Sequence, residues 1–404
     1  MSGTLTSVRQ WFWSEPVWIP PNTTWSLYED NYRHFNDIYY SLITAVFLIG
    51  IRFTLERYIY APVGIYLGLR PTHGKSPPHN AILEQAFRAS KGKLSHKQIQ
   101  GLSKQLDWTE RQVQRWVRLK TACNRPTVLS KFTESAWRCN FYFVSFVYGV
   151  YVLWDKPWMW DSMYCFIDYP HHSISSGEWF YYNFETAFYL ALLFSQFIDV
   201  QRKDFWAMFI HHVVSLCLLG FSWACNLVRI GTLVLLIHDF ADIPLEGAKM
   251  MVYVKKQRLA DGIFVVFTVC WIVSRIGLLP YRILYYSLYK ALDVVPMFAA
   301  YYIFNGLLCA LQALHIVWTW FIVRIAIHAV NNNGIKDLRS DDESSEGSLK
   351  DSSDELLNGA IDGSNVLNKN YSNGGLKTVT NSSINLITNN HNKSQRRHSN
   401  DDNL

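Results

Sequence analysis

The chain has 404 residues, a formal net charge of +6 and an aromatic content of 16%. Its mean hydropathy of 0.00 is the average of a long apolar part and a polar part. Apolar stretches fill most of residues 38–327, whereas the last ~75 residues are polar and rich in Asn and Ser, as in disordered segments. The seven cysteines include no CxxC pair, which excludes a disulfide framework. The composition therefore indicates an all-α integral membrane protein with a disordered C-terminal tail.

Residues 1–36 lack the apolar core of a cleavable signal peptide, so we expect the first span to act as the membrane anchor. Apolar stretches of roughly 20 residues are long enough for a helix to cross hydrocarbon. Arg52 and several tyrosines dilute the first stretch, but the later ones are more uniform. About seven transmembrane helices are expected, at 37–55, 138–154, 179–198, 205–225, 227–247, 262–283 and 298–326.

Basic residues predict the orientation of these spans. Segment 52–138 contains 16 Lys and Arg against 5 Asp and Glu, a balance of 16 − 5 = +11. The positive-inside rule then places the N-terminus in the lumen and the C-terminus in the cytosol. The sequon at Asn22 falls on the predicted lumenal side, where it can be glycosylated. Sequons at Asn370, Asn381 and Asn392 fall on the cytosolic side and are expected to stay unmodified.

Residues 70–130 are predicted to form a small cytosolic helical module. Ser95 and Thr109 are helix-start signals. The stretch TERQVQRWVRLK resembles the third helix of a homeodomain, and the preceding QIQGLSKQLDWT resembles its second helix and turn. Leu119 stands where homeodomains carry the Asn that reads adenine. We therefore do not expect DNA as a partner, and favour a scaffold or a basic surface on the anionic membrane face.

The segment from Arg202 to Met250 is the most informative in the chain. Two apolar stretches, separated by a short bend, are expected to form an antiparallel helical pair. His211 lies seven residues after Asp204, and Asp242 lies seven residues before Lys249, so both sit roughly 10 Å from the cytosolic ends. Ionisable groups inside a membrane are costly and mark functional sites. The candidate catalytic residues are His211, His212, Asp239 and Asp242.

Arg229 near the bend and Arg275 within the sixth span are costly charges in a membrane. Arg275 is expected either to pair with a carboxylate such as Glu185 or to contact a polar group of a substrate. His238 lies beside Asp239 but on another helix face, and structural and functional roles are both open.

Asn305, Gln312 and His315 lie near one stripe of the last span. They either line a substrate cavity or bridge helices through hydrogen bonds. Two His and two Asp residues are a donor set that zinc or iron accepts. The HxxxH and HxxHH boxes of membrane desaturases are absent from the sequence, however, so no metal is expected.

The predicted tail, residues 329–404, contains the stretch LRSDDESSEGSLKDSSDELL. Acidic residues follow three positions after Ser340, Ser348 and Ser352, a pattern that acid-directed kinases prefer. Phosphorylation at these serines is expected to add charge to a segment that is already solvated.

The chain resembles the ceramide synthases of the TLC-domain family. The motifs FIHH, FSW and HDFAD together with the homeodomain-like module carry this resemblance, which runs from about residue 20 to 330. Phe240 and Pro244 depart from the usual pattern. The resemblance implies that residues 131–328 form a catalytic membrane domain of six helices in the endoplasmic reticulum, acting as a homodimer or heterodimer.

The activity that the resemblance implies is transfer of a fatty acyl group from acyl-CoA to the amine of a sphingoid base, giving (dihydro)ceramide. Acyl-CoA is then a co-substrate, and no cofactor is expected. Arg229, Arg275, His238 and Asn305 become candidates for substrate binding within the membrane. A lumenal segment of the family is implicated in acyl-chain length. Here the corresponding candidates are Ser287, Leu288, Lys290, Asp293 and Met297.

The chemistry permits two roles for histidine. It can act as the base that takes the proton of the amine, with a carboxylate fixing its tautomer, or as a nucleophile that forms an acyl-imidazole. A different function, lipid binding or translocation without catalysis in the same fold, would require neither the His pair nor the Asp pair. Both pairs are present here, which favours the enzyme.

Overall fold

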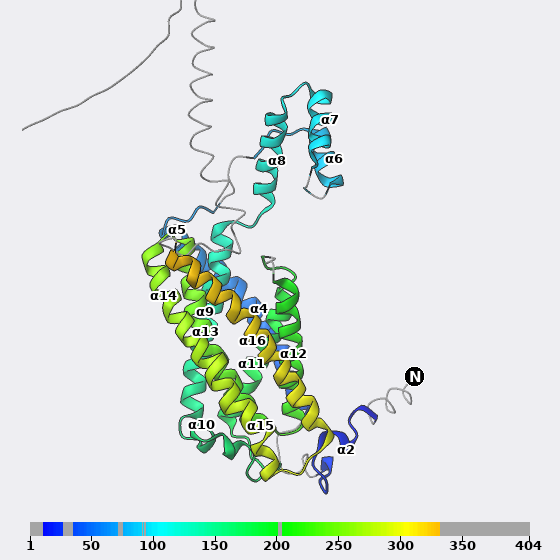
Figure 1. The fold of residues 1–404 in the computed structure, drawn as a ribbon, viewed down its shortest axis with the longest axis vertical. Coiled ribbons are helices and arrows are strands. Elements are labelled where there is room, and N and C mark those ends of the chain that lie inside the picture. The colour runs from blue at the N-terminus through cyan, green and yellow to red at the C-terminus, as the bar shows by residue number, and fades with distance from the viewer. Residues whose placement is uncertain are drawn as a thin grey trace, which may run out of the picture. The chain divides into compact units, whose positions relative to one another are not determined.

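The computed structural model describes residues 11–26, 35–71, 76–90, 92, 94–200 and 204–331, with side chains up to residue 327. The described residues form helices, turns and connecting segments without a β-strand, which confirms the all-α prediction (Figure 1). The predicted phosphorylation sites Ser340, Ser348 and Ser352 and the tail sequons lie outside the described residues.

The first membrane helix is longer than predicted. Helix α4 (Tyr39–Leu55) continues through a π-helical turn, η2 (Glu56–Tyr60), into α5 (Ala61–Tyr66). Arg52 does not end this helix because its charge is compensated. Its guanidinium lies 2.8 Å from Glu56 and 2.6 Å from Asp199, and Asp199 also contacts Arg138 at 2.8 Å. These buried ion pairs join α4 to α9 and to the residues that follow α11.

The later helices carry the predicted site. Figure 1 shows α13 among α9, α11, α14 and α16, and α13 packs against α9, α11, α12, α14 and η4. A helix surrounded in this way can bury polar groups that would be costly against lipid. The helices are α9 (Val128–Leu153), α11 (Ser176–Ser195), α12 (Phe205–Ala224), α13 (Val228–Tyr253), α14 (Gln257–Trp271) with the π-helical continuation η4 (Ile272–Tyr285) and α15 (Tyr286–Leu288), and α16 (Ala299–Asn331).

Within the described chain, four helical stretches are long and apolar enough to cross a membrane: Asn36–Tyr66, Phe205–Ala224, Gln257–Asp293 and Ala299–Ile327. Helices also occupy the three other predicted spans, as α9, α11 and α13. Each of these three contains several ionisable residues, which lower its hydropathy. The seven-span arrangement is therefore a proposal, and the described chain establishes a helical protein with membrane-spanning candidates.

Proline affects two of these helices differently. Pro244 lies within the continuous helix α13, where it leaves the carbonyl of Phe240 without its usual helical donor. The Phe240 ring packs against Phe146 with centroids 5.6 Å apart. Pro280 lies within the π-helical stretch η4, where the wider turn accommodates the missing N–H.

The segment 76–126 contains three short helices with a core of their own. They are α6 (Ala81–Ala89), α7 (His96–Leu106) and α8 (Glu110–Asn124). Ser95 and Thr109 form capping boxes with Gln98 and Gln112, so both predicted helix starts are confirmed. The buried residues of this module are Leu83, Phe87, Leu102, Val113 and Trp116.

Four other short elements lie at the ends of the long helices. The N-terminal α2 (Glu15–Trp18) packs against α16, and Trp18 contacts Phe221 near the end of α12. Between α9 and α11 lie α10 (Pro157–Trp160) and the 3₁₀ turn η3 (Ser162–Cys165). A further 3₁₀ turn, η5 (Lys290–Asp293), follows α15. Asn22 is exposed.

Candidate functional site

The bend between α12 and α13 is held by the loop that precedes α11. Asn226 adopts a left-handed conformation with a φ of 57°. Its side-chain amide donates to the carbonyl oxygens of Pro170 and His172 at 2.7 and 2.9 Å. The Tyr169 hydroxyl donates to the carbonyl of Cys225 at 2.8 Å. The two helices are thereby fixed as the antiparallel pair that was predicted.

Tyr189 of α11 connects the two predicted halves of the site. Its ring centroid lies 6.4 Å from that of His211 and 6.3 Å from that of His212. It also lies within electrostatic reach of Asp239 and Asp242. Both histidines are buried, and in the described part of the chain the Nδ1 atom of each lacks a hydrogen-bond partner. The His pair and the Asp pair thus meet around a tyrosine ring.

Asp239 lies against a second carboxyl group that comes from α11. Glu185 and Asp239 are both fully buried and their carboxyl groups interact electrostatically, and in the described chain both carboxyl oxygens of Asp239 lack a hydrogen-bond partner. The Ser145 hydroxyl of α9 donates to Glu185. Two buried carboxylates close to each other repel unless one of them holds a proton. The arrangement can store and return one proton beside the histidines.

Asp242 has a different partner. Arg275, in η4, lies 3.3 Å from its carboxylate and also donates to the carbonyls of Ile237 and His238 at 2.7 and 2.8 Å. The expected pairing of Arg275 with a carboxylate is confirmed, but the partner is Asp242 of α13 and not Glu185 of α11. Arg275 is positioned on the backbone of the HDFAD segment.

A fourth buried histidine completes the cluster from α16. His315 is 1% exposed, and its ring lies 5.1 Å from that of His238 and 6.4 Å from that of His211. His238 Nδ1 donates to the Val234 carbonyl at 2.6 Å, which leaves Nε2 as the unprotonated atom of a neutral ring. That Nε2 is buried and has no hydrogen-bond partner in the described chain. His238 is therefore part of the histidine cluster and is also hydrogen-bonded to the backbone of its own helix.

The histidine cluster adjoins an apolar cavity that encloses about 680 Å³ of space, including space open to the outside. His238 and Tyr189 lie on its wall, together with Ser215 of α12. From His238 the cavity follows α13 to Leu227, a distance of roughly 16 Å at the rise of an α-helix. An apolar group in this cavity therefore lies against His238 from within the bundle.

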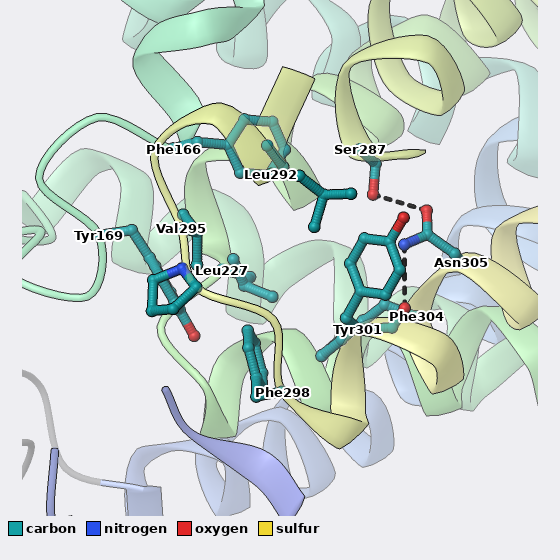
Figure 2. A pocket seen from close by; sticks show the side chains of 12 residues that line it. Phe166, Tyr169, Leu227, Ser287, Leu292, Val295, Phe298, Tyr301, Phe304 and Asn305 are labelled. Carbon is teal, nitrogen blue, oxygen red and sulfur yellow. Dashed lines mark hydrogen bonds between the residues drawn. The ribbon is translucent and has the colours of Figure 1, made fainter. Parts of the chain in front are cut away.

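A second cavity of about 410 Å³ lies under the segment that connects α15 to α16. Figure 2 shows its wall, including Ser287, whose hydroxyl donates to Asn305 at 2.8 Å. The Asn305 amide donates in turn to the carbonyl of Tyr301 at 2.9 Å. Asn305, predicted to bind substrate, thus lines this second cavity and not the histidine cluster.

The other predicted residues lie apart from the histidines. Arg229, one turn into α13, donates to the Tyr164 carbonyl at 3.0 Å and stacks over Trp158, so it holds the loop that precedes α11. Lys290 and Asp293 pair with each other on the surface at 3.4 Å. The remaining members of the predicted chain-length segment are Leu288, which is half-buried against the main core, and Met297, which is 50% exposed.

Within the described residues, no group of three or more His, Cys, Asp or Glu side chains is arranged to hold a metal ion. Asp242 is paired with Arg275, whereas neither carboxyl oxygen of the buried Asp239 has a hydrogen-bond partner in the described chain. Histidine and carboxyl side chains together can transfer protons.

Comparison with known proteins identifies the family to which the chain belongs. A family model described as the TLC domain matches residues 131–324. Ceramide synthase 5 of Homo sapiens is 41% identical over 352 residues, which cover 85% of this chain and 89% of the relative. The chain belongs to the ceramide synthase family. Ceramide synthase 3 of Mus musculus is 39% identical, with 83% and 88% of the two chains covered. Ceramide synthase 4 of Homo sapiens is 37% identical, with 89% and 93% covered.

In this member of the ceramide synthase family, sequence reasoning missed Tyr189, named Glu185 only as a possible partner of Arg275, and named His315 only as a cavity-lining or bridging residue. Glu185 and Tyr189 occupy neighbouring turns of α11, and His315 comes from α16. Glu185 had a usable signal, since a carboxylate inside a predicted span marks a functional position. Tyr189 had none, because tyrosines are frequent throughout this chain. His172, in the loop before α11, is 2% exposed and therefore belongs to the packed interior.

Proposed function

We propose that this chain transfers a fatty acyl group from acyl-CoA to the amine of a sphingoid base, forming (dihydro)ceramide and free CoA. The observation that carries the proposal is the apolar cavity that ends at His238 and Tyr189, beside His211 and His212, in a chain 41% identical to a ceramide synthase. An acyl chain matches such a cavity because its walls are almost entirely apolar. The reacting thioester then lies at the histidine end.

The transfer has two balanced routes. In the direct route, a neutral amine attacks the thioester carbon, a histidine accepts the amine proton, and the C–S bond breaks as CoA leaves and is protonated. In the two-step route, a histidine nitrogen first displaces CoA, and the amine then attacks the acyl-imidazole. His211 and His212 are about 100° apart around α12, so one is placed for chemistry while the other orients a substrate group. The Glu185–Asp239 pair accepts or returns the proton in either route.

Arg275 contributes by position. It neutralises Asp242 and holds two carbonyls of α13, so the HDFAD segment keeps its orientation against the histidines. We propose that the catalytic residues are the four predicted from the sequence, His211, His212, Asp239 and Asp242, together with Glu185. No cofactor takes part, with acyl-CoA as co-substrate and no metal.

The proposed topology has seven spans in the endoplasmic-reticulum membrane, with a lumenal N-terminus and a cytosolic C-terminus. The excess of basic residues in segment 52–138 supports it. The three-helix module then faces the cytosol and rests its basic surface on anionic lipid, and DNA is not its partner. Homodimers or heterodimers with related synthases are part of the proposal.

The experiment uses membranes from cells that lack their own ceramide synthases. Wild type and the double variant His211→Ala, His212→Ala are given sphinganine and a panel of acyl-CoAs, and N-acyl product is quantified. We expect product from wild type and a loss of about 10²-fold or more in an equally expressed variant. Undiminished product would remove the His pair from the mechanism. Absence of product from wild type at every chain length would favour lipid binding without catalysis.

The two routes are separated by omitting the sphingoid base. Purified wild type is incubated with acyl-CoA alone and its peptides are analysed by mass spectrometry. An acyl group on a histidine of α12, lost when sphinganine is added, identifies the two-step route. Ceramide formation without any such adduct identifies direct transfer.

A further inference from the structure

The two cavities described above share part of their walls. Four residues line both: Phe166, Leu227, Ser287 and Phe304. They come from three separate parts of the chain: the loop before α11, the bend before α13, and the two sides of the segment that links α15 to α16. All four are at most half exposed, and Phe166 and Phe304 are 5% and 7% exposed. These four residues form a partition between the cavities.

The partition lies at the end of the larger cavity that is remote from the histidines. Along α13 the lining runs from His238 to Leu227, and along α16 it runs through Leu311 and Leu308 to Phe304. The three α16 residues are spaced by three and four positions, so they form one stripe on a helix face. An acyl chain whose thioester lies at the histidines must therefore end at Phe304 and Leu227.

The smaller cavity continues beyond this partition. Figure 2 shows Phe304, Leu227, Leu292 and Val295 among the residues around it. Its wall is predominantly apolar, so it can accept the additional methylenes of a longer chain. Among the exposed residues of the connecting segment, Leu292 and Pro296 line the smaller cavity, whereas Lys290 and Asp293 line neither.

We propose that the partition, with Phe304 and Phe166 as its bulky members, sets the longest acyl chain that the site accepts. This inference rests on the proposed acyl transfer. The aromatic rings stop a chain in the larger cavity, and removal of one ring opens a path into the smaller cavity. Chain length is then selected by buried rings from α16 and from the loop before α11.

The test compares the acyl-CoA preference of wild type, Phe304→Leu and Phe166→Leu in membranes without endogenous ceramide synthases. Each receives sphinganine and acyl-CoAs that differ by two carbons, and every product is quantified as a fraction of the total. We expect the optimum to move to longer chains, with the long-to-short product ratio rising about tenfold or more, because each methylene in an apolar pocket discriminates by that order. Leu308→Phe, one turn closer to the histidines, is expected to move the optimum to shorter chains.

Tyr302→Leu is the matched control, since Tyr302 lies two residues from Phe304 on α16 but is 63% exposed and lines neither cavity. Its product profile should coincide with that of wild type. An unchanged optimum in both Phe304→Leu and Phe166→Leu, with total activity retained, overturns the partition. An equal shift in Tyr302→Leu also overturns it. Wild type without product at any chain length contradicts the proposed acyl transfer itself. If one Phe variant is not produced as folded protein, the other decides, because the two rings belong to different elements.

Discussion

The guanidinium of Arg275 lies 3.3 Å from the carboxylate of Asp242, and the contact joins η4 to α13 inside the bundle. The same guanidinium donates to the carbonyls of Ile237 and His238 and stacks over Trp271 at 5.1 Å. Asp242 thereby neutralises a positive charge that would be costly in a membrane. The Arg275 side chain also holds the backbone of the histidine-rich segment in place. It also explains why α13 can carry two carboxylates in neighbouring turns.

Replacement of Asp242 by Ala should destabilise the protein because the buried Arg275 loses the carboxylate with which it pairs. Breaking a buried pair costs about 3–5 kcal/mol, and the two carbonyl contacts of Arg275 place the expected value near the lower limit. Thermal unfolding of the purified protein in detergent measures the effect. The double variant Asp242→Leu, Arg275→Met should recover part of the loss, and equal melting of Asp242→Ala and wild type would contradict the pairing.

The contact between Glu185 and Asp239 predicts a difference between two substitutions of Glu185. Glu185→Gln keeps a hydrogen-bonding group beside Asp239 and should retain most of the stability. Glu185→Ala leaves the buried hydroxyl of Ser145 without its partner, at a cost of about 1–3 kcal/mol. Unfolding in detergent and ceramide formation are measured on both variants. Equal behaviour of the two would show that the carboxyl pair does not support the site.

Asp199 accepts hydrogen bonds from Arg52 and Arg138, and its side chain is 8% exposed. Asp199→Ala should lower the free energy of unfolding by about 3–5 kcal/mol, because two largely buried guanidinium groups lose a shared partner. Asp293→Ala is the control, since its pair with Lys290 is exposed and contributes at most about 1 kcal/mol. Similar melting temperatures for the two variants would show that these ion pairs do not hold α4 in the bundle.

His172 predicts a pH dependence of the loop before α11. Burial lowers the pKa of its imidazole from 6.5 to about 4, and Nε2 contacts the Ile167 carbonyl at 2.7 Å. Because the folded pKa lies below the unfolded value, the stabilisation is complete above pH 6.5 and is lost as the pH falls through about 4. Hydrogen exchange of amides near residues 167–173 should therefore accelerate between pH 6.5 and 4.

The histidine next to His172 supplies a control for this pH profile. His172→Gln removes the titrating group and should flatten the pH dependence of exchange, whereas His171→Gln should leave it as in wild type, because His171 is exposed. A profile that persists in His172→Gln would assign the pH dependence to another group.

Glycosylation tests the orientation of the chain. Asn22 is exposed, so its sequon is accessible if the N-terminus is lumenal. Treatment with an endoglycosidase should increase the gel mobility of wild type but not of Asn22→Gln. The triple variant with Gln at Asn370, Asn381 and Asn392 should behave as wild type. A mobility shift that disappears only in the triple variant would reverse the proposed topology.

The sequence alone was sufficient for those features that depend on neighbours along the chain. Ser95 and Thr109 marked helix starts because a cap bonds to residues two or three positions away. The antiparallel pair α12 and α13 followed from two apolar stretches with a short bend. His211 and Asp242 could be placed at a common depth because an α-helix rises by a constant amount per residue.

Only the tertiary structure decided which side chains meet across helices. Glu185 lies against Asp239 and not against Arg275, and His172 is buried by packing against the α12–α13 bend. The partition of Phe304 and Phe166 also joins residues more than a hundred positions apart. Such contacts depend on the rotation of each helix about its axis and on the crossing of neighbouring helices, which residue periodicity leaves undetermined.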